Sequence, residues 1–406
     1  MTRRLLVPAG CSTILLLLVL SAAGCGDDDG GSPRPTPTPT ASPTPTPRPA
    51  QFVALPFSNE NFANCVANGI SDDGTVVVGQ CVNEENEFEP VRWVNGVVER
   101  LGFPSPQPDV TVNAFAYAVS DSGVITGNEG ILDLTPLAYY YASGAWHPIE
   151  DATAGAVAQA PWAISSDGSV LVGGAAVDGA DLPPRQRGTG FIFRPATGSM
   201  ATVPTNFTAE CSGDANTCVT ELLAVDATGA TAVGSDAYYP DDLTQPPLQV
   251  PIVYAIGAGE PARQLPLEGY RNGIAQTISR NGRVVAGAVG NDDATSVGVY
   301  WTLAAEEPVY IGSLGSGDTS SFGVSNAGVV VGYSNEMAFL YYRDAEGIGV
   351  MRSLQEYLVS VGLENELEGW DLWVARAITP DGKRICGFGE HDGYRRAFVA
   401  QLPVLR

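Results

Sequence analysis

The sequence predicts an all-β protein, a seven-bladed β-propeller of four-stranded blades, from three observations. A turn motif first seen at residues 70–79, Ile-Ser-Asp-Asp-Gly-Thr-Val-Val-Val-Gly, occurs in seven similar copies. The copies are spaced by about 51 residues, in the range of propeller repeats. A strand with aromatic residues follows each copy, and four antiparallel strands in each of seven repeats are typical of a propeller. The turn glycines are Gly74, Gly123, Gly168, Gly229, Gly282, Gly328 and Gly382.

Residues 1–24 are predicted to be a lipoprotein signal peptide, outside the fold. Two arginines precede an apolar run, Ile14 to Leu20, which is too short to cross a bilayer. The run ends in Ala-Ala-Gly-Cys25, which resembles a bacterial lipobox. The resemblance implies cleavage before Cys25 and lipidation of that cysteine, and secretion without lipid is the alternative. We therefore expect an exported, membrane-anchored lipoprotein of the outer membrane or cell surface, with a periplasm-facing position left open.

Residues 25–50 are predicted to carry the lipidated cysteine and a disordered linker. A charged, glycine-containing start is followed by proline alternating with threonine, arginine or serine over residues 33–49. Such a run cannot bury a core and favours extended polyproline II structure, a semi-rigid spacer. The linker would hold the next domain away from the membrane.

Residues 51–406 are predicted to form the propeller. In the first repeat Thr75 to Val78 is rich in β-branched residues, and Gly74 suits the left-handed position that ends a three-residue hairpin loop. The first strands carry Ala or Gly just before the turn, which suits the crowded strands nearest the axis of a propeller. A capping box at residues 353–356 predicts one helix that ends near Gly362.

Closure of the ring is predicted to use the N-terminal strand. The seventh repeat ends at residues 398–402 with no clear fourth strand, and residues 51–55 form a strand that precedes the first repeat. If this strand completes the last blade, the exposed sheet edges disappear.

Cysteine positions predict two disulfides in an exported protein. If residues 72–74 form a three-residue loop, Ser71 faces Thr75, and stepping outward along the hairpin Cys65 faces Cys81. Cys211 and Cys218 flank a second loop and form the other predicted pair. Cys386 remains, as a small buried apolar residue rather than a reactive thiol.

The repeats resemble the HAF-family extracellular repeat, a bacterial secreted repeat. The shared pattern is small-Ile-(Ser/Asn)-x-x-Gly-x-Val-Val-Gly followed by an Ala-Phe-aromatic strand, and residues 373–398 match it best. The resemblance covers nearly all of residues 51–406 and implies the fold and an extracellular or envelope location. The family has no established reaction, so the resemblance transfers no site residue.

Composition excludes several function classes. The net charge of −24 argues against nucleic acid as a partner and against docking on anionic lipid other than through the lipid anchor. Solubility is the alternative reason for this charge. Two histidines exclude a multi-histidine metal site, and the chain has no nucleophile-elbow or P-loop motif. We therefore predict no catalytic residue.

The candidate binding face is the end of the blades that carries the connections between second and third strands, because long loops on a rigid scaffold often bind ligands. Taken as residues 80–89, 128–137, 174–190, 235–250, 288–297, 333–337 and 388–396, these loops hold sixteen Asp or Glu, four Arg and no Lys. Carboxylates suit calcium, the candidate cofactor, and equally a cationic partner. The candidate residues are Glu84, Glu85, Glu87, Asp236, Asp241, Asp242, Asp292, Asp293, Glu390 and Asp392.

Two functions remain open from the sequence. The favoured one is a monomeric binding or scaffolding module for an extracellular or envelope ligand, either a protein or a glycan. The alternative is a lyase or hydrolase acting on polysaccharide or another extracellular polymer, because propellers host both kinds of function. Carboxylates that converge on the axis with Arg, Tyr or His would favour the enzyme, and scattered acidic loops would favour binding.

Overall fold

The computed structural model describes most of the compact unit Pro47–Arg406. The described residues form one helix and the strands whose bounds are given in the next paragraph. Within the described residues no helix is long and apolar enough to cross a membrane. The described residues are 49–57, 64–105, 112–131, 136–150, 156–177, 188–207, 217–240, 247–291, 295–305, 307–403 and 405.

Strands dominate the described residues, as the repeat pattern predicts. The first half of the chain contains β1 (Gln51–Ala54), β2 (Cys65–Ile70), β3 (Val76–Val82), β4 (Phe88–Val94), β5 (Val97–Arg100), β6 (Val112–Val119), β7 (Ile125–Ile131), β8 (Leu137–Ala142), β9 (Ala145–Pro148), β10 (Ala156–Ile164), β11 (Leu171–Val177), β12 (Gly188–Arg194) and β13 (Ser199–Val203). The second half contains β14 (Thr217–Val225), β15 (Thr231–Tyr239), β16 (Leu248–Ala255), β17 (Arg263–Gln264), β18 (Asn272–Ile278), β19 (Val284–Gly290), β20 (Val297–Thr302), β21 (Pro308–Gly312), β22 (Thr319–Val324), β23 (Val330–Ser334), β24 (Met337–Arg343), β25 (Gly349–Ser353), α1 (Leu354–Ser360), β26 (Trp370–Ile378), β27 (Arg384–His391) and β28 (Tyr394–Gln401).

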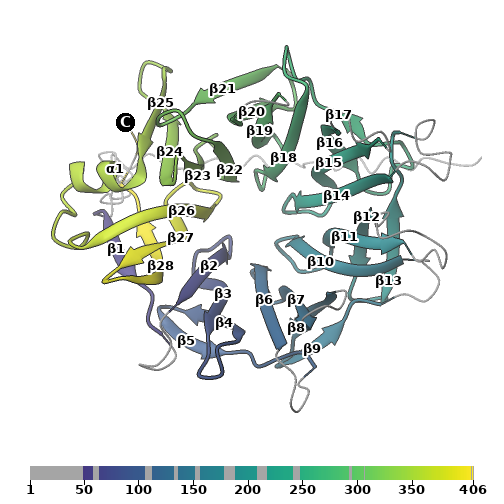
Figure 1. The fold of residues 1–406 in the computed structure, drawn as a ribbon, viewed down its shortest axis with the longest axis horizontal. Coiled ribbons are helices and arrows are strands. Elements are labelled where there is room, and N and C mark those ends of the chain that lie inside the picture. Colours follow the sequence, from purple (N-terminus) through teal and green to yellow (C-terminus); the bar gives the residue numbers. More distant parts are fainter. Residues whose placement is uncertain are drawn as a thin grey trace, which may run out of the picture. The chain divides into compact units, whose positions relative to one another are not determined.

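Consecutive strands pair into antiparallel sheets around a common centre (Figure 1). Five sheets have four strands each, and one has eight. The eight-stranded sheet consists of the antiparallel groups β10–β13 and β14–β17, which are joined only by a single parallel pair, Gly188 with Val219. In every group the strand before the turn motif lies nearest the centre: β2, β6, β10, β14, β18, β22 and β26 (Figure 1).

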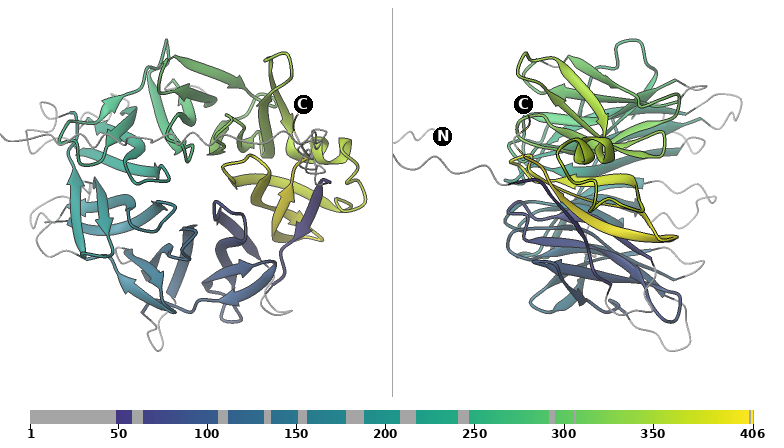
Figure 2. Two further views of the ribbon diagram at one scale, coloured as in Figure 1. Left: turned by 180° about the vertical axis from the view of Figure 1, so that it is seen from behind. Right: turned by 90° about the vertical axis from the view of Figure 1, so that its left-hand side faces the viewer.

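The N-terminal strand joins the end of the chain. β1 pairs antiparallel with β28 over four residues, from Gln51 opposite Gln401 to Ala54 opposite Phe398. Phe52 anchors the pair, because its ring lies 5.0 Å from the ring of Trp370 and 5.5 Å from that of Phe398. Figure 2 shows β1 running beside β28.

The core lies between neighbouring sheets. Aromatic side chains of the third strands fill much of it, as the sequence predicts. Trp93 and Trp301 are almost fully buried, and each indole N–H donates to a proline carbonyl, Pro56 at 2.8 Å and Pro266 at 2.9 Å. These bonds satisfy the only polar atom of each ring, so burial of the ring costs little. One apolar cluster combines β2–β4 with Cys386 and other residues of the last sheet, so the first and last repeats share a core.

The disulfide Cys65–Cys81 is confirmed, with an S–S distance of 1.96 Å. The hairpin register that predicted it needs a correction near the turn, because the Ser71 N–H donates to the Val76 carbonyl rather than pairing with Thr75. The loop is therefore one residue longer than predicted. A β-bulge at Asn68 adds one residue to β2. The added residue offsets the longer loop, so that Cys65 again lies opposite Cys81.

The predicted turn at Gly74 and the predicted helix after Ser353 are both present. Gly74 has φ 72°, as its turn position requires. Helix α1 is confirmed: the Ser353 hydroxyl accepts from the Glu356 N–H, although the helix ends at Ser360, two residues before Gly362.

The expectation of long loops between second and third strands is wrong in the last two repeats. Residues 335–336 and 392–393 are two-residue turns between long strands, and all four residues have positive φ. This conformation is that of the tight hairpin turns whose twist matches the flanking strands.

Candidate functional site at the axis

Each inner strand carries a β-bulge that directs one extra side chain toward the axis. In β2, Ala67 pairs with Gly79 and Gly69 with Val78, so Asn68 has no partner across the ladder. The same irregularity recurs in all seven inner strands. Bulges re-aim side chains and are common beside functional sites. The bulge residues are Asn68, Tyr117, Trp162, Leu223, Gln276, Phe322 and Arg376.

The bulge explains the glycine that closes each copy of the turn motif. In β27 a Cβ on Gly387 would lie 2.1 Å from the carbonyl oxygen of Val374, which the bulge at Arg376 turns toward it. The corresponding glycine of every other repeat faces an equivalent carbonyl, at 1.8 Å to 2.4 Å. Any side chain there would collide with backbone, so the bulge and the glycine occur together.

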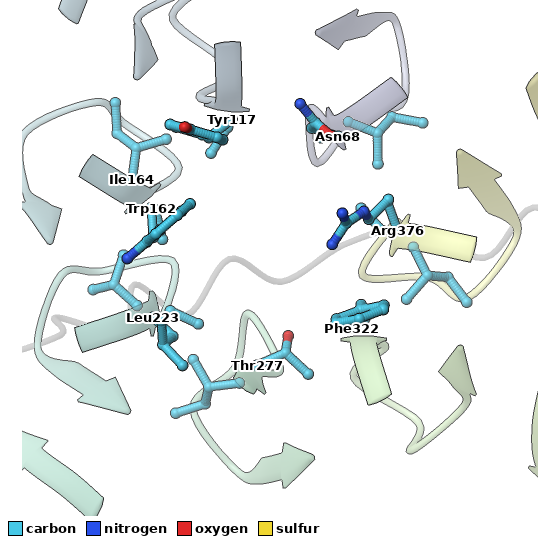
Figure 3. Close-up of a pocket in the computed structure, with 18 of the residues that line it drawn as sticks. Asn68, Tyr117, Trp162, Ile164, Leu223, Thr277, Phe322 and Arg376 are labelled. Carbon is cyan, nitrogen blue, oxygen red and sulfur yellow. The ribbon is translucent and has the colours of Figure 1, made fainter. Parts of the chain in front are cut away.

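The bulge residues surround an axial cavity of about 150 Å³. Figure 3 shows Tyr117, Trp162, Phe322 and Arg376 pointing into it from different strands. Behind them the walls are the small and apolar residues that end each inner strand, such as Ala118 and Ile164. The small residues predicted at these positions thus provide the room that the bulge side chains occupy.

One end of the axial cavity is bridged by an ion pair between distant repeats. The Arg280 Nε lies 2.6 Å from Oδ1 of Asp72, and its Nη1 donates to the carbonyl of Ile164 at 2.8 Å. The Ser166 hydroxyl donates to the other oxygen of Asp72. Because these residues come from the turns of the first, third and fifth repeats, they tie the turn end of the cavity across the axis.

The turns are also linked from each repeat to the next by hydrogen bonds. The residue after the motif Ser or Asp donates its N–H to the equivalent carbonyl of the following repeat: Asp121 to Ser166, Ser166 to Ala227, Ala227 to Arg280 and Asn326 to Pro380, at 2.9–3.1 Å. Elsewhere side chains make the link, through Asp73 N–H to Asp121 Oδ1 and Asn281 N–H to Asn326 Oδ1.

The link from the seventh repeat to the first is made by a side chain, because Pro380 has no N–H to donate. The Arg384 Nη1 instead donates to the carbonyl of Gly74 at 2.6 Å. Every pair of neighbouring repeats is therefore joined at the turn end.

Arg376 is a cation without a polar partner. Among the described residues it forms no hydrogen bond or ion pair, and its buried Nε has no hydrogen-bond partner. Its guanidinium lies over the rings of Phe322 at 4.7 Å and Phe388 at 5.9 Å. Burial lowers the pKa of Arg376, and the groups that oppose this shift are Cys386, Tyr117 and Tyr333, none of them a carboxylate.

A second cavity, which we call the aromatic pocket, meets the axial cavity at Phe322 and Arg376. Its volume is about 520 Å³. Phe322 and Tyr333 stack with ring centroids 5.7 Å apart and form one wall. The complete lining is Phe322, Tyr333, Glu336, Trp373, Val374, Arg376 and Phe388.

On the opposite side of the axis a half-buried carboxyl contacts another bulge residue. Glu221 accepts a hydrogen bond from the indole N–H of Trp162 at 2.5 Å. Burial raises the pKa of Glu221, and the bond from Trp162 partly opposes the shift. Glu221 thus fixes the ring that faces the cavity.

The predicted acidic residues are dispersed where the structure describes them. Glu84 and Glu85 are exposed on the β3–β4 connection, while Glu87 is half-buried and accepts from the Val112 N–H at 3.0 Å. Glu390 lies in β27, and Asp392 lies in the turn that follows. No group of three His, Cys, Asp or Glu in the described part of the chain is placed to hold a metal ion. Cys25, Asp241, Asp242, Asp292 and Asp293 lie outside the described residues.

Asp236 and Cys218, two of the predicted site residues, are held inside the fold by bonds to other residues. Asp236 is fully buried in β15 rather than exposed on a loop, and it accepts from Thr205, Asn206 and Thr220 at 2.7–2.9 Å. These bonds identify a structural carboxylate that ties the strand group β14–β17 to the segment that follows β13. Cys218 is disulfide-bonded, but its predicted partner Cys211 lies outside the described residues, so this pairing stays a prediction.

Sequence reasoning missed the axial residues and the aromatic pocket. The signal was present, since each axial residue directly precedes the small residue that opens the motif, as Arg376 precedes Ala377. These seven residues are chemically diverse, so composition did not distinguish them. The pocket depends on packing between repeats, which a repeat pattern does not describe.

Comparison with known proteins shows the fold and no family. No family model matches the chain, and no curated protein matches its sequence. An oligogalacturonate lyase in complex with manganese has 11% identity and a TM-score of 0.50, with 88% of this chain and 98% of that chain covered. A puromycin hydrolase has 14% identity and a TM-score of 0.50, with 84% and 52% covered.

A third solved structure, TolB from Acinetobacter baumannii, has 13% identity and a TM-score of 0.41, with 69% of this chain and 63% of that chain covered. The chain therefore spans about half the length of the hydrolase and less than two thirds of that TolB. At these identities the likeness concerns the fold alone. Together with the four-stranded antiparallel sheets, the likeness to the lyase and the hydrolase identifies the chain as a β-propeller protein.

Proposed function

We propose that this chain is an exported, lipid-anchored β-propeller that binds an extracellular or envelope ligand at its axis. The observation that carries the proposal is the set of seven bulges, which aim seven chemically different side chains at one place. A bulge disturbs the ladder of its own sheet, so its repetition in every inner strand favours a role for the residues it presents. The ion pair of Arg280 with Asp72 at the turn end leaves the other end as the side of entry.

The proposed ring has seven blades and is closed by the N-terminal strand. Supporting observations are the pairing of β1 with β28, the core shared by the first and last repeats, and the bond from Arg384 to Gly74. In this arrangement the last blade contains β26, β27, β28 and β1. A closed ring would hold the axial side chains at fixed mutual positions, as a preorganised site requires.

The proposed location rests on sequence features. A positively charged start, a short apolar run and the lipobox-like segment before Cys25 support export and lipidation. The resemblance to the HAF-family repeat supports an extracellular or envelope setting. The confirmed disulfide Cys65–Cys81 agrees with an oxidising compartment.

The lining of the axial cavity favours binding over catalysis. Its one described carboxylate, Asp72, is paired with Arg280. Aromatic rings and a lone guanidinium are typical of recognition sites, in which apolar walls surround few polar groups. A glycoside hydrolase of the usual kind would place two carboxylates on the cavity wall.

A binding screen with glycans and metal ions tests the proposed function. Any ligand found should lose at least tenfold in affinity when Leu223→Trp fills the axial cavity, because the added ring occupies the space that the bulge residues surround. The matched control is Val97→Trp, since Val97 is 66% exposed on the outer strand β5. A ligand whose affinity ignores Leu223→Trp would refute binding at the axis.

A further inference from the structure

The aromatic pocket contains an unsatisfied positive charge. Arg376 is the only cation among its described lining residues, and it forms no ion pair with a described carboxylate, Glu336 of the same lining included. An isolated charge removed from water is costly unless something pairs with it. A negatively charged ligand would provide that partner in the bound state.

The number of hydrogen-bond donors in the aromatic pocket indicates the charge of the ligand that the pocket can hold. One guanidinium offers a planar set of N–H groups that matches a carboxylate. A phosphate dianion would need further donors, and the rest of the described lining offers mainly aromatic and aliphatic side chains. Glu336 in the two-residue turn would repel a second negative charge. The pocket therefore suits a single carboxylate.

The side chains that form the walls of the aromatic pocket indicate the shape and polarity of the rest of the ligand. Phe322 and Tyr333 present stacked rings, and Trp373 and Phe388 line the same pocket. Such walls suit a flat apolar group that stacks or meets them edge to face. A cavity of about 520 Å³ falls within the range of small-molecule sites.

We infer that the aromatic pocket binds a small organic monocarboxylate with a flat apolar body, and that Arg376 holds the carboxylate. This inference rests on the proposed binding function and names its ligand class. The competing role of Arg376 is structural, through its contacts with Phe322 and Phe388. The two roles predict different effects of replacing Arg376 on the stability of the fold. A structural arginine stabilises the fold, whereas an unpaired ligand-binding arginine does not.

Titration calorimetry of the full chain with 3-phenylpropionate and its neutral amide tests the inference. The two probes have nearly the same size, so their difference reports the carboxylate. We expect the acid to bind at least tenfold more tightly than the amide, as for a hydrogen-bonded charge pair. Arg376→Gln should abolish this preference without lowering the melting temperature, and Arg376→Lys should retain part of it.

The matched control is Arg395→Gln. Arg395 lies over the rings of Trp373 at 5.9 Å and Phe388 at 5.6 Å, but its side chain is exposed and it does not line the pocket. The preference for the acid should change less than twofold in this variant.

Equal binding of acid and amide, binding of neither probe, or a preference that survives Arg376→Gln would each overturn the inference. A lower melting temperature of Arg376→Gln together with a retained preference would assign Arg376 the structural role. A screen ligand that is lost in Leu223→Trp but unaffected by Arg376→Gln would overturn this inference and leave the proposed function intact.

Discussion

Replacing Gly387 by alanine should destabilise the protein through the bulge in β26. An ideal Cβ at this position lies 2.1 Å from the carbonyl oxygen of Val374, 2.9 Å from the Phe398 ring and 3.0 Å from Ala375 Cα. A comfortable carbon–oxygen contact is about 3.3 Å, so the new methyl group overlaps the carbonyl by more than about 1 Å. Two of the three neighbours are backbone atoms, which move only if the ladder of β26 and β27 deforms.

The expected loss can be worked from these contacts. Overpacking in a filled interior costs about 1–3 kcal/mol, and one weakened ladder hydrogen bond adds about 0.5–1.5 kcal/mol. We therefore expect Gly387→Ala to lower the free energy of unfolding by about 2–4 kcal/mol. With an unfolding entropy of about 2.1 cal/mol/K per residue over a unit of about 360 residues, the melting temperature should fall by about 3–5 °C.

Differential scanning calorimetry of Gly387→Ala and of a matched control variant measures this change in melting temperature. Gly130→Ala also replaces a strand glycine, but the nearest atom to its new Cβ is Pro136 Cβ at 4.0 Å. This control should be neutral or gain about 0.4–1 kcal/mol from the stiffer unfolded chain. If Gly387→Ala melts at the same temperature as Gly130→Ala, the physical account of the motif glycine is wrong.

Three other outcomes are expected. Deleting residues 51–56 should lower the melting temperature, since it removes buried Phe52 and the pairing of β1 with β28; an unchanged melting curve would contradict closure by this strand. Arg376→Met should leave the melting temperature unchanged or raise it, because the substitution removes an unpaired, half-buried charge whose Nε is fully buried. Burial raises the pKa of Cys386 to about 12, so the folded protein holds this proton after the unfolded chain has lost it. Stability should therefore fall between about pH 9 and pH 12 more in the wild type than in Cys386→Ala, and equal pH dependence by urea titration would rule this out.

Local chemistry in the sequence predicted much of the fold. The turn glycines, the β-branched second strands and the aromatic third strands all act within one hairpin or one sheet, where period and turn residues carry the information. The pairing of Cys65 with Cys81 was also predicted, although two deviations cancel in its register: a loop one residue longer than expected and a bulge at Asn68. The glycine that closes each motif copy accompanies the bulge, but its link to the bulge is clear only once the carbonyl facing it is seen, and nothing in the residues of the turn distinguished a four-residue loop from a three-residue one.

The candidate site was predicted less well, for a physical reason. Acidic residues such as Asp236 were assigned to exposed loops by sequence position, but in the structure three hydrogen bonds hold Asp236 inside the fold. The aromatic pocket joins residues 322 and 388, which come from adjacent repeats and meet only when their sheets pack. A single-sequence pattern describes contacts within a repeat and not those between repeats.

The recurring bulge separates what folds the protein from what it recognises. The backbone of each inner strand is shaped by the carbonyl and glycine pair behind it, as for Val374 and Gly387, and not by the side chain that the bulge presents. Seven positions around one axis can therefore vary independently while the scaffold stays the same. Related chains could acquire new ligands by changing these positions alone. A designer could build new binding sites by substituting residues at the same seven positions.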